Sequence, residues 1–308
     1  EPTHPVLIFE EMDIANQSEM IDSFIRLDED ECACLLYTSG TTGAPKGVMT
    51  SHRSMIANST LSMLQGAAVS QDSSSKGIDW AKHKPTSLLT SPLFHVSGLS
   101  AGVVTSLFAG STTLLYAGKF SAHKILELID KFNVTSWGGA VPTALKRVLD
   151  AANETNISLP SVLVVGGGGA PMPPALIERT KEVFPSSKYS FGYGYGLTES
   201  GAITIINWGE NLNSNPASPG QVMPTVNVEL RDEEGQVILE DNEEGEIFVR
   251  SPSVMLGYFN NPEASSESLL EDRWLRTGDF GFKEGHLFFI SSRRTDLILR
   301  GAENVYPQ

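Results

Sequence analysis

The segment from Tyr37 to Gly47 holds the densest set of groups in the sequence that could bind a polyphosphate. It reads Tyr-Thr-Ser-Gly-Thr-Thr-Gly-Ala-Pro-Lys-Gly and combines four Ser and Thr hydroxyls, three glycines and one lysine. Hydroxyl, backbone N–H and ammonium donors suit concentrated negative charge. The spacing differs from the nucleoside-triphosphatase loop G-x-x-x-x-G-K-[ST], because Pro45 stands five residues after Gly40 and Gly47 follows Lys46. We interpret the segment as a phosphate-binding loop; the alternative is a Ser/Gly-rich surface loop.

Glycine clusters mark three places where strands are expected to deliver ligand-binding loops. The clusters lie at 40–47, 166–169 and 192–196, and each follows a short apolar or β-branched run. Strands ending in glycine loops present backbone N–H groups at the edge where α/β proteins bind ligands. The predicted strands are Cys34–Tyr37, Val162–Val165, Tyr189–Phe191, Ser87–Thr90 and Thr112–Tyr116.

Helices are predicted between these strands, where apolar residues recur at three-to-four spacing. The predicted helices are Ser54–Leu64, Leu99–Phe108, Ala122–Phe132, Pro142–Ala152 and Pro173–Phe184. We place Pro142 and Pro173 as the prolines that open their helices. Alternating strands and helices predict an α/β fold with mostly parallel sheets covered by helices, over residues 32–207.

The character of the sequence changes after Trp208. Asn, Pro and Ser crowd 211–218, and acidic turns such as Asp232–Gly235 separate the short strand candidates that follow. These candidates are Asn227–Leu230, Val237–Leu239 and Glu246–Arg250. The pattern predicts a small β-rich subdomain over 208–292. We interpret the acidic runs as solvated turns rather than as a metal cluster.

Composition limits the classes of function. The 308 residues predict about two domains, and 22 Lys+Arg against 37 Asp+Glu give a net charge of −15. So negative a chain argues against nucleic-acid partners. No apolar run reaches the ~18 residues of a membrane span, and we expect no signal peptide. Cys32 and Cys34 are poorly spaced for bridging each other, which favours a reducing, cytoplasmic location.

The order of motifs along the chain resembles the adenylate-forming enzymes, a superfamily that includes acyl- and aryl-CoA synthetases, luciferases and peptide-synthetase adenylation domains. The 37–47 segment looks like that family's phosphate-loop signature. Five further segments resemble its later motifs in order: Gly167–Pro171, Tyr193–Glu199, Gly245–Ile247 with Val254–Tyr258, Trp274–Asp279, and Arg293 at the start of the hinge. The resemblance runs from about residue 33 to the C-terminus and implies the N-terminal domain of an acyl-CoA synthetase followed by its β-rich subdomain.

The resemblance implies a binding site for ATP and Mg²⁺. Lys46 and the loop would hold the β- and γ-phosphates, Tyr195 would stack on adenine, and Thr198 would donate to the α-phosphate. Glu199, with Thr38, is placed at the magnesium ion, a hard cation that prefers oxygen ligands. The implied nucleotide contacts are Thr38, Ser39, Gly40, Thr41, Thr42, Gly43, Lys46, Gly168, Gly169, Ala170, Tyr195, Gly196, Thr198, Asp279 and Arg293.

Two of these contacts concern the ribose. The resemblance implies that Asp279 accepts hydrogen bonds from both ribose hydroxyls and that Arg293 donates to the same sugar. Taken singly, Asp279 could be a turn residue and Tyr195 a core aromatic. The ordered set of motifs favours the nucleotide roles.

An acid-substrate pocket is implied around His95, which follows a Pro-Leu-Phe run. Alone, a histidine beside apolar neighbours is more often a core residue. Peptide-synthetase domains carry an aspartate at this place to capture an amino group, so His95 counts against an amino-acid substrate. The implied pocket residues are His95, Trp137, Gly138, Val141, Gly168 and Ala202. The absence of charge among them favours an apolar acid, fatty or aryl.

The implied reaction has two steps, with Lys46, His95, Thr198 and Glu199 as its catalytic residues. A carboxylate attacks the α-phosphorus of ATP to give an acyl-adenylate, and coenzyme A then displaces AMP. We expect residues 1–31 to be the tail of an upstream subdomain and 293–308 to be a hinge and the start of a missing lid, with Thr295 in place of the usual pivot. The family's adenylation lysine lies on that lid, so we expect the chain to be a fragment.

Two other classes of function remain open. The chain could be a nucleotide- or acyl-binding module without turnover. It could also be a serine hydrolase, because Gly98–Gly102 fits G-x-S-x-G, with Ser100 as the nucleophile and His123 or His286 downstream. The hydrolase is disfavoured, because that motif requires the serine at a sharp turn ending a strand, and Ser100 falls where a helical pattern begins.

Overall fold

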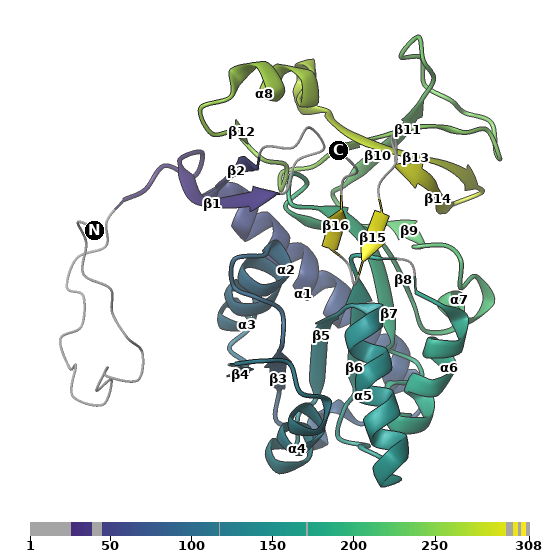
Figure 1. Ribbon diagram of the computed structural model, residues 1–308. Helices are drawn as coiled ribbons and strands as arrows, with labels where there is room; N and C mark the ends of the chain where they lie inside the picture. Colours follow the sequence, from purple (N-terminus) through teal and green to yellow (C-terminus); the bar gives the residue numbers. More distant parts are fainter. Residues whose placement is uncertain are drawn as a thin grey trace.

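A computed structural model describes residues 26–38, 45–116, 118–170, 172–293, 298–300 and 303–305. At 202, 292–293, 298–300 and 303–305 the description is of the backbone only. Figure 1 shows one large sheet flanked by helices, with the smaller sheets gathered at its upper end. This is the arrangement predicted from sequence: a mostly parallel sheet with helices, joined to a small antiparallel β unit.

The large sheet has seven strands, and their order differs from their order in the chain. The order is β4 (Thr112–Leu115), β3 (Thr86–Leu89), β5 (Ser136–Ala140), β6 (Val164–Gly168), β7 (Gly192–Leu197), β8 (Ala202–Trp208) and β9 (Gln221–Val222). Every pair from β4 to β7 is parallel. β8 and β9 add antiparallel strands at the far edge.

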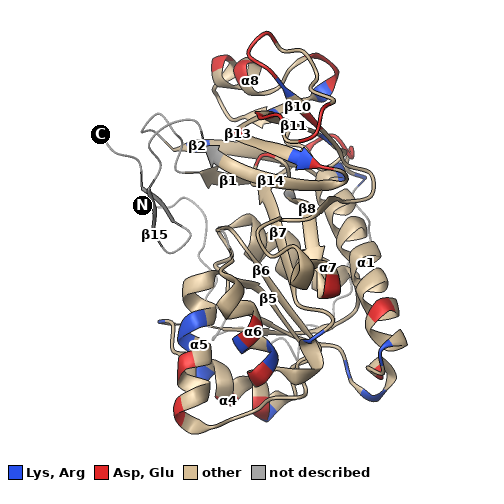
Figure 2. Cartoon of the chain, turned by 90° about the vertical axis from the view of Figure 1, so that its right-hand side faces the viewer, with Lys and Arg blue, Asp and Glu red and all other residues tan. Residues whose placement is uncertain are grey.

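Helices cover both faces of this sheet. α4 (Ala122–Phe132), α5 (Pro142–Thr155) and α6 (Pro174–Val183) lie on one face and α1 (His52–Ser75) on the other, as Figures 1 and 2 show from two sides. α4 has the predicted limits because Ser121 caps its first turn and Asn133, with a φ of 47°, ends it in the left-handed conformation. The core between the sheet and these three helices is centred on Trp137, Phe184 and Phe191, all essentially buried.

Several helix limits differ from the predictions; α5, for example, ends at Thr155 rather than at Ala152. α1 extends to Ser75 rather than ending at Leu64, because polar contacts replace the apolar pattern: Ser73 Oγ donates to the Val69 carbonyl and accepts from Trp80 Nε1. Pro173 is the residue before the first turn of α6, and Pro174 opens it. The predicted 99–108 helix is part of a longer helical run made of α2 (Val96–Gly98), η4 (Leu99–Val104, a π-helical turn) and α3 (Thr105–Phe108).

Two glycine clusters lie inside strands, which corrects the prediction that they form loops after strands. β6 begins at Val164 and contains Gly166, Gly167 and Gly168, and β7 begins at Gly192. At some of these glycines a side chain would meet a neighbouring group. A Cβ on Gly167 would lie 2.6 Å from the Met172 side chain. Many of the backbone groups expected to face a ligand therefore belong to the sheet.

The first glycine cluster follows a strand that lies outside the large sheet. β1 (Cys32–Thr38) pairs antiparallel with β2 (Lys46–Ser51), and β2 pairs with β12 (Gly257–Tyr258). The polyphosphate segment is therefore a hairpin connection rather than a strand-to-helix loop. Residues 39–44 within it lie outside the described residues.

The remaining elements build the β-rich part. A four-stranded antiparallel sheet has the order β10 (Asn227–Arg231), β11 (Gly245–Arg250), β13 (Leu275–Glu284) and β14 (Leu287–Arg293). The predicted strand Val237–Leu239 is wrong, because only a single bridge from Val237 to Arg231 forms there. The other elements are α7 (Gly209–Ser214), α8 (Pro262–Ser268), β15 (Ile298–Arg300), β16 (Glu303–Val305) and the 3₁₀ turns η3 (Trp80–Lys82), η5 (Pro185–Ser187) and η6 (Glu271–Arg273). The subdomain limits at 32, 208 and 293 stay predictions.

Charged side chains lie away from the centre of the large sheet. Figure 2 shows them on the outer helices and on the loops of the smaller sheets. Strands β5 to β8 contain no Asp, Glu, Lys or Arg. Cys32 and Cys34 are free thiols on one strand. Among the described residues, no helix has both the length and the apolar character needed to cross a bilayer.

Candidate functional site

The candidate site lies at the carboxyl edge of the large sheet. Because β3, β5, β6 and β7 are parallel, the segments that follow them emerge at the same edge. These segments carry His95, Gly138 to Val141, Gly168 to Ala170, and Thr198 with Glu199. The turn after β7 is hydrogen-bonded to the chain leading into β12, so this edge faces the smaller sheets (Figure 1).

The hairpin of β1 and β2 places two predicted phosphate ligands side by side. Thr38 and Lys46 are directly opposite in the antiparallel register. The Lys46 ammonium nitrogen lies over the ring of Tyr258, 5.0 Å from the ring centroid. The predicted contacts Ser39, Gly40, Thr41, Thr42 and Gly43 lie outside the described residues.

The turn between β7 and β8 presents Thr198 and Glu199. Gly201 N–H donates to the Thr198 carbonyl at 3.1 Å. Gly201 has a φ of +84°, and a Cβ there would lie 2.3 Å from the Ser253 carbonyl oxygen. Only glycine meets both demands without strain. The turn is tied down further where Ser253 Oγ donates to the Ser200 carbonyl at 2.8 Å.

Glu199 is held at both its backbone and its side chain. Met255 N–H donates to the Glu199 carbonyl at 2.9 Å. The Tyr258 hydroxyl donates to Glu199 Oε1, also at 2.9 Å. Tyr258 is the last residue of the Val254–Tyr258 motif, and the sequence alone did not predict a role for it. A tyrosine closing that motif was the only signal available, and its contacts come from residues distant in the chain.

The predicted adenine and ribose residues meet in one hydrogen bond. The Tyr195 hydroxyl donates to Asp279 Oδ2 at 2.7 Å. Asp279 is buried, and its N–H donates to Thr277 Oγ1, which in turn donates to the Ile247 carbonyl. Arg293 is the strand partner of Asp279 in the β13–β14 pair, which brings their backbones together as a shared ribose site requires. The side chain of Arg293 is outside the description.

The glycine residues beside Tyr195 occupy the ends of β6 and β7. Gly168 pairs with Gly194, and a Cβ on Gly168 would lie 3.1 Å from the Gly194 carbonyl oxygen. Gly169 leaves the strand with a φ of +76° and leads to Ala170. The register shifts between Tyr195 and Gly196, so this edge of β7 is bulged. The predicted adenine-side contacts therefore lie together at adjacent strand ends.

His95 precedes the first turn of α2 and caps it. Ser97 N–H donates to His95 Nδ1 at 3.2 Å, and Ser97 Oγ lies 2.9 Å from the same nitrogen. Although the residue is exposed, the protein around its ring partly desolvates it and lowers its pKa below the ordinary value of 6.5. A histidine that accepts a backbone hydrogen bond through Nδ1 is in its neutral form.

The other predicted pocket residues divide into two groups. Trp137 is fully buried, contacts Phe184 edge-on at 6.1 Å between ring centroids, and donates from Nε1 to Thr90 Oγ1. Its indole is part of the core, so this geometry gives no support to a place on an open pocket wall. Gly138 has open space where a Cβ would lie, and Val141 caps α5. The side chain of Ala202 lies outside the description.

Ser100 does not have the environment of a catalytic nucleophile. It lies within the helical turn η4, is buried, and its Oγ accepts a hydrogen bond from Asn58 Nδ2 at 2.9 Å. His123 is on α4, where it faces Glu154 at 3.8 Å. A hydrolase elbow needs its serine exposed at a strand end. The hydrolase interpretation is therefore wrong for this serine.

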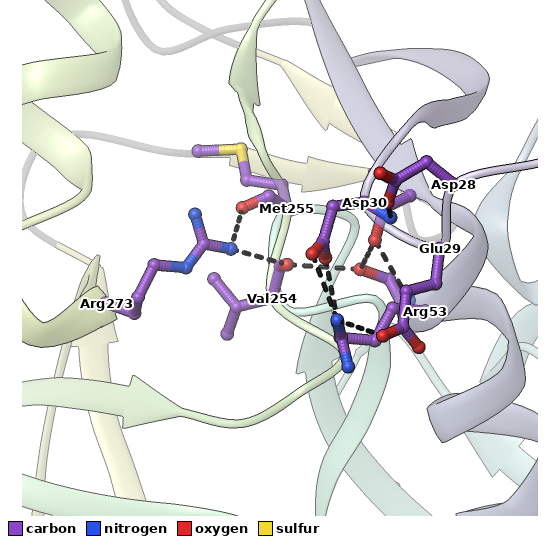
Figure 3. Close-up of polar contacts among 9 residues, drawn as sticks. Asp28, Glu29, Asp30, Arg53, Val254, Met255 and Arg273 are labelled. Carbon is purple, nitrogen blue, oxygen red and sulfur yellow. Dashed lines mark hydrogen bonds and ion pairs between the residues drawn. The ribbon is translucent and has the colours of Figure 1, made fainter.

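A cluster of charged residues anchors the segment that holds Glu199 (Figure 3). Arg273 donates to the carbonyls of Val254 and Met255, at 3.2 and 2.7 Å. Arg53 at the start of α1 binds Glu29 and Asp30, at 2.6 and 2.8 Å. Arg273 thereby holds the strap, the name we give to residues 253–258, whereas the Arg53 ion pairs tie residues 29–30 to α1.

A magnesium ion fits this site only together with phosphate oxygens. Among the residues the structure describes, no group of three or more His, Cys, Asp or Glu side chains could hold a metal. Glu199 offers one carboxylate and Thr38 one hydroxyl. Because Mg²⁺ is commonly bound through one or two carboxylates plus substrate phosphates, this sparse donor set suits a nucleotide-borne ion.

Comparison with known proteins gives a consistent result. A sequence model described as "AMP-binding enzyme" matches residues 5–259. The 2-succinylbenzoate–CoA ligase of Bacillus subtilis is 35% identical over 292 residues, which is 94% of this chain and 54% of that protein. The long-chain-fatty-acid–CoA ligase of the same organism is 34% identical over 283 residues, 91% of this chain and 47% of that protein. The chain spans about half the length of the curated relatives it matches.

Solved structures show the same relationship. The o-succinylbenzoate coenzyme A synthetase of Bacillus subtilis, in complex with ATP and magnesium, superposes with a TM-score of 0.73 at 33% identity, covering 92% of this chain and 55% of that one. The same enzyme with its acyl-adenylate intermediate gives a TM-score of 0.73 over 91% of this chain and 53% of that one.

Proposed function

The chain belongs to the AMP-binding enzyme family, and from that premise we propose that its protein activates a carboxylic acid with ATP and transfers the acyl group to coenzyme A. The observation that carries the proposal is the convergence at one sheet edge of three contacts made by two tyrosines. Tyr258 meets both Lys46 and Glu199, and Tyr195 meets Asp279. β7 and its turn carry Tyr195 and Glu199, so a nucleotide could reach both sets of groups at once.

Each nucleotide group has a proposed partner in this arrangement. We assign the phosphates to Lys46, the hairpin loop and Thr198; adenine to the ring of Tyr195 and the strand ends at Gly168–Ala170 and Gly196; and the ribose to Asp279 and Arg293. The ammonium and hydroxyl donors match phosphate oxygens, and a buried carboxylate matches vicinal hydroxyls. Glu199 and Thr38 are the proposed protein ligands of Mg²⁺, which when bound would neutralise phosphate charge.

The proposed chemistry requires positioning more than a protein nucleophile. A carboxylate oxygen of the acid forms a bond to the α-phosphorus, and the bond from that phosphorus to pyrophosphate breaks. The thiol of coenzyme A then adds to the acyl carbon, its proton is released, and the bond to AMP breaks. Lys46 and Thr198 would act by holding the phosphates in line and stabilising their charge.

We propose an apolar carboxylic acid as the substrate. Two relatives are named for 2-succinylbenzoate, a dicarboxylate with an aromatic ring, and for long-chain fatty acids, and the second of these has the apolar, uncharged body that we propose. The neutral form of His95 and the open space at Gly138 support an uncharged substrate body. The free thiols of Cys32 and Cys34 support a cytoplasmic location.

The test is acid-dependent exchange of labelled pyrophosphate into ATP by the full-length protein, across a panel of fatty and aryl acids, followed by thioester formation with coenzyme A. We expect exchange with at least one apolar acid and none without acid. Nucleotide binding without exchange for any acid would contradict the proposal and favour a binding module. Lys46→Ala should abolish exchange while leaving the fold intact, because Lys46 is only half-buried.

A further inference from the structure

We infer that Tyr258 is a positioning residue for binding of the magnesium–nucleotide complex, because it holds the carboxylate of Glu199 and the ammonium of Lys46 apart and in fixed places. The inference rests on the proposed function. Tyr258 belongs to neither the phosphate hairpin nor the turn after β7, yet it contacts a charged side chain from each.

The contact with Glu199 fixes one carboxylate oxygen. Tyr258 is 7% exposed, so its hydroxyl has little access to water as an alternative partner. It donates to Glu199 Oε1 at 2.9 Å. Hydrogen bonds to ionised acceptors are stronger than neutral ones, and this one limits the rotation of the Glu199 side chain. A metal ligand held in one orientation loses less entropy when the ion binds.

The contact with Lys46 uses the face of the same ring. The ammonium lies 5.0 Å from the ring centroid, within the range of a cation–π interaction. Within the described part of the chain no ion pair joins Lys46 to Glu199. The tyrosine therefore acts as a spacer between opposite charges that would otherwise neutralise each other. The cation stays available to phosphate and the carboxylate to the metal.

Hydrogen bonds on both sides of Tyr258 fix its backbone and so the position of its ring. In the β12–β2 pair Tyr258 lies opposite Val48, and Phe259 N–H donates to the Gly47 carbonyl at 2.7 Å. Tyr258 N–H also donates to Ser265 Oγ at 2.8 Å, which ties it to α8. The same pairing holds the strand that carries Lys46. Movement of the ring relative to Lys46 is therefore limited by direct main-chain contacts.

The experiment measures binding of a fluorescent N-methylanthraniloyl ATP to the full-length protein, in EDTA and across a magnesium titration. Tyr258→Phe keeps the ring under Lys46 but removes the bond to Glu199. We expect it to raise the magnesium concentration at half-maximal binding by about three- to tenfold, with little change in metal-free affinity and a lowered thermal midpoint, because Glu199 loses a donor. Tyr258→Leu also removes the ring, and we expect it to weaken metal-free binding by about two- to fivefold.

A matched control is Tyr189→Phe. Tyr189 also carries lysines over its ring, Lys76 at 5.1 Å and Lys188 at 5.2 Å, but lies away from the candidate site. This variant should bind the probe as wild type does. A magnesium midpoint unchanged by Tyr258→Phe, in a protein whose wild-type form binds the probe in a magnesium-dependent way, overturns the inference and leaves the proposed function standing. A wild type with no magnesium-dependent binding overturns the proposed function itself.

Glu199→Asp completes a double-mutant cycle with Tyr258→Phe and tests whether Tyr258 acts through Glu199. The shorter side chain keeps the charge but draws the carboxylate away from the Tyr258 hydroxyl. We expect the same rise in the magnesium midpoint, and Tyr258→Phe added to it should change that midpoint less than about twofold, because the shared bond is already lost. Additive effects of the two substitutions would show that Tyr258 does not act through Glu199.

Discussion

The Tyr195 hydroxyl donates to Asp279 Oδ2 at 2.7 Å, joining two residues that are 84 positions apart in the sequence. The bond connects β7 of the large sheet to β13 of the four-stranded sheet. It also places the two side chains that are proposed to bind adenine and ribose in direct contact. The two sheets therefore meet at the place where a nucleoside is expected to bind.

Tyr195→Phe should weaken both stability and nucleotide binding. The ring that would stack on adenine remains, but the buried carboxylate of Asp279 loses a donor. We expect the free energy of unfolding to fall by about 1–2 kcal/mol and ATP affinity to fall by about three- to tenfold. Urea denaturation and isothermal titration with ATP measure the two effects.

The matched control for this substitution is Tyr116→Phe. The Tyr116 hydroxyl donates to the Lys119 carbonyl at 2.6 Å, far from the proposed nucleoside site. It should lower stability without changing ATP affinity. If Tyr195→Phe binds ATP as tightly as wild type, Asp279 does not need Tyr195 to recognise the ribose.

Gly201→Ala should disrupt the turn that presents Thr198 and Glu199. The substitution adds a Cβ at a φ of +84°, 2.3 Å from the Ser253 carbonyl oxygen. Left-handed backbone and a main-chain clash together should cost about 2–4 kcal/mol of the free energy of unfolding. ATP affinity should fall as well, because the turn must move to relieve the clash.

Gly235→Ala separates the cost of the left-handed backbone from the cost of the main-chain clash. Gly235 has a similar φ of +80°, but nothing lies within 4 Å of a Cβ built there. Only the conformational penalty applies, so we expect a loss of about 1 kcal/mol and unchanged ATP affinity. Equal losses of stability at both positions, measured by urea denaturation, would show that the contact with Ser253 relaxes freely.

The side-chain hydrogen bonds of Arg273 should stabilise the fold by more than its left-handed backbone conformation destabilises it. Its φ is +65°, which favours glycine, yet its guanidinium binds the carbonyls of Val254 and Met255 (Figure 3). Arg273→Ala loses the hydrogen bonds and keeps the strain, and should lower the free energy of unfolding by about 1 kcal/mol. Arg273→Gly removes the strain too, so its loss should be smaller.

Because Arg273 holds the strap, substitutions of Arg273 should also change the magnesium dependence of ATP binding. Because Met255 also binds the Glu199 carbonyl, both substitutions should raise the magnesium requirement for ATP binding. Arg53→Ala is the comparison: its ion pairs with Glu29 and Asp30 are exposed, so its effect on the unfolding midpoint should shrink with added salt. If Arg273→Gly leaves magnesium dependence unchanged, the strap does not transmit the contact to Glu199.

The sequence predicted the layers of the fold because its strands and helices have clear periodic patterns. α4 has the predicted limits, since a Ser cap and an Asn end bracket a strong apolar stripe. The patterns did not predict the limits of elements that depend on tertiary contacts. Glycines at 166–168 pair with both neighbouring strands and so belong to β6, and α1 continues past Leu64 on polar contacts such as that between Ser73 and Trp80.

The candidate site shows the same division between local signal and tertiary contact. Thr38, Lys46, Thr198 and Glu199 were predicted from ordered motifs, and the structure brings Lys46 and Glu199 to one tyrosine, with Thr198 next to Glu199 in the turn after β7. Tyr258 had no local signal for its role, because its partners lie 59 residues away and farther in the chain. Spacing cannot reveal a contact between three separate elements.

Stability should depend on the protonation of His95. Its pKa is lowered by desolvation from the ordinary value of 6.5, so the unfolded chain binds a proton more readily than the folded one. The stability contributed by neutral His95 is therefore fully present above pH 6.5 and is lost as the pH falls from there toward the lowered pKa. Protonation also replaces the Nδ1 acceptor with a donor and so breaks the bond from Ser97 N–H.

His95→Asn tests this directly, because asparagine keeps an acceptor at a helix start but does not titrate. Urea unfolding midpoints measured between pH 5 and pH 8 should show wild type losing stability relative to His95→Asn as the pH falls below 6.5. Parallel profiles for wild type and His95→Asn would show that His95 titrates equally in the folded and unfolded chain, and that its hydrogen bond from Ser97 N–H contributes nothing to stability.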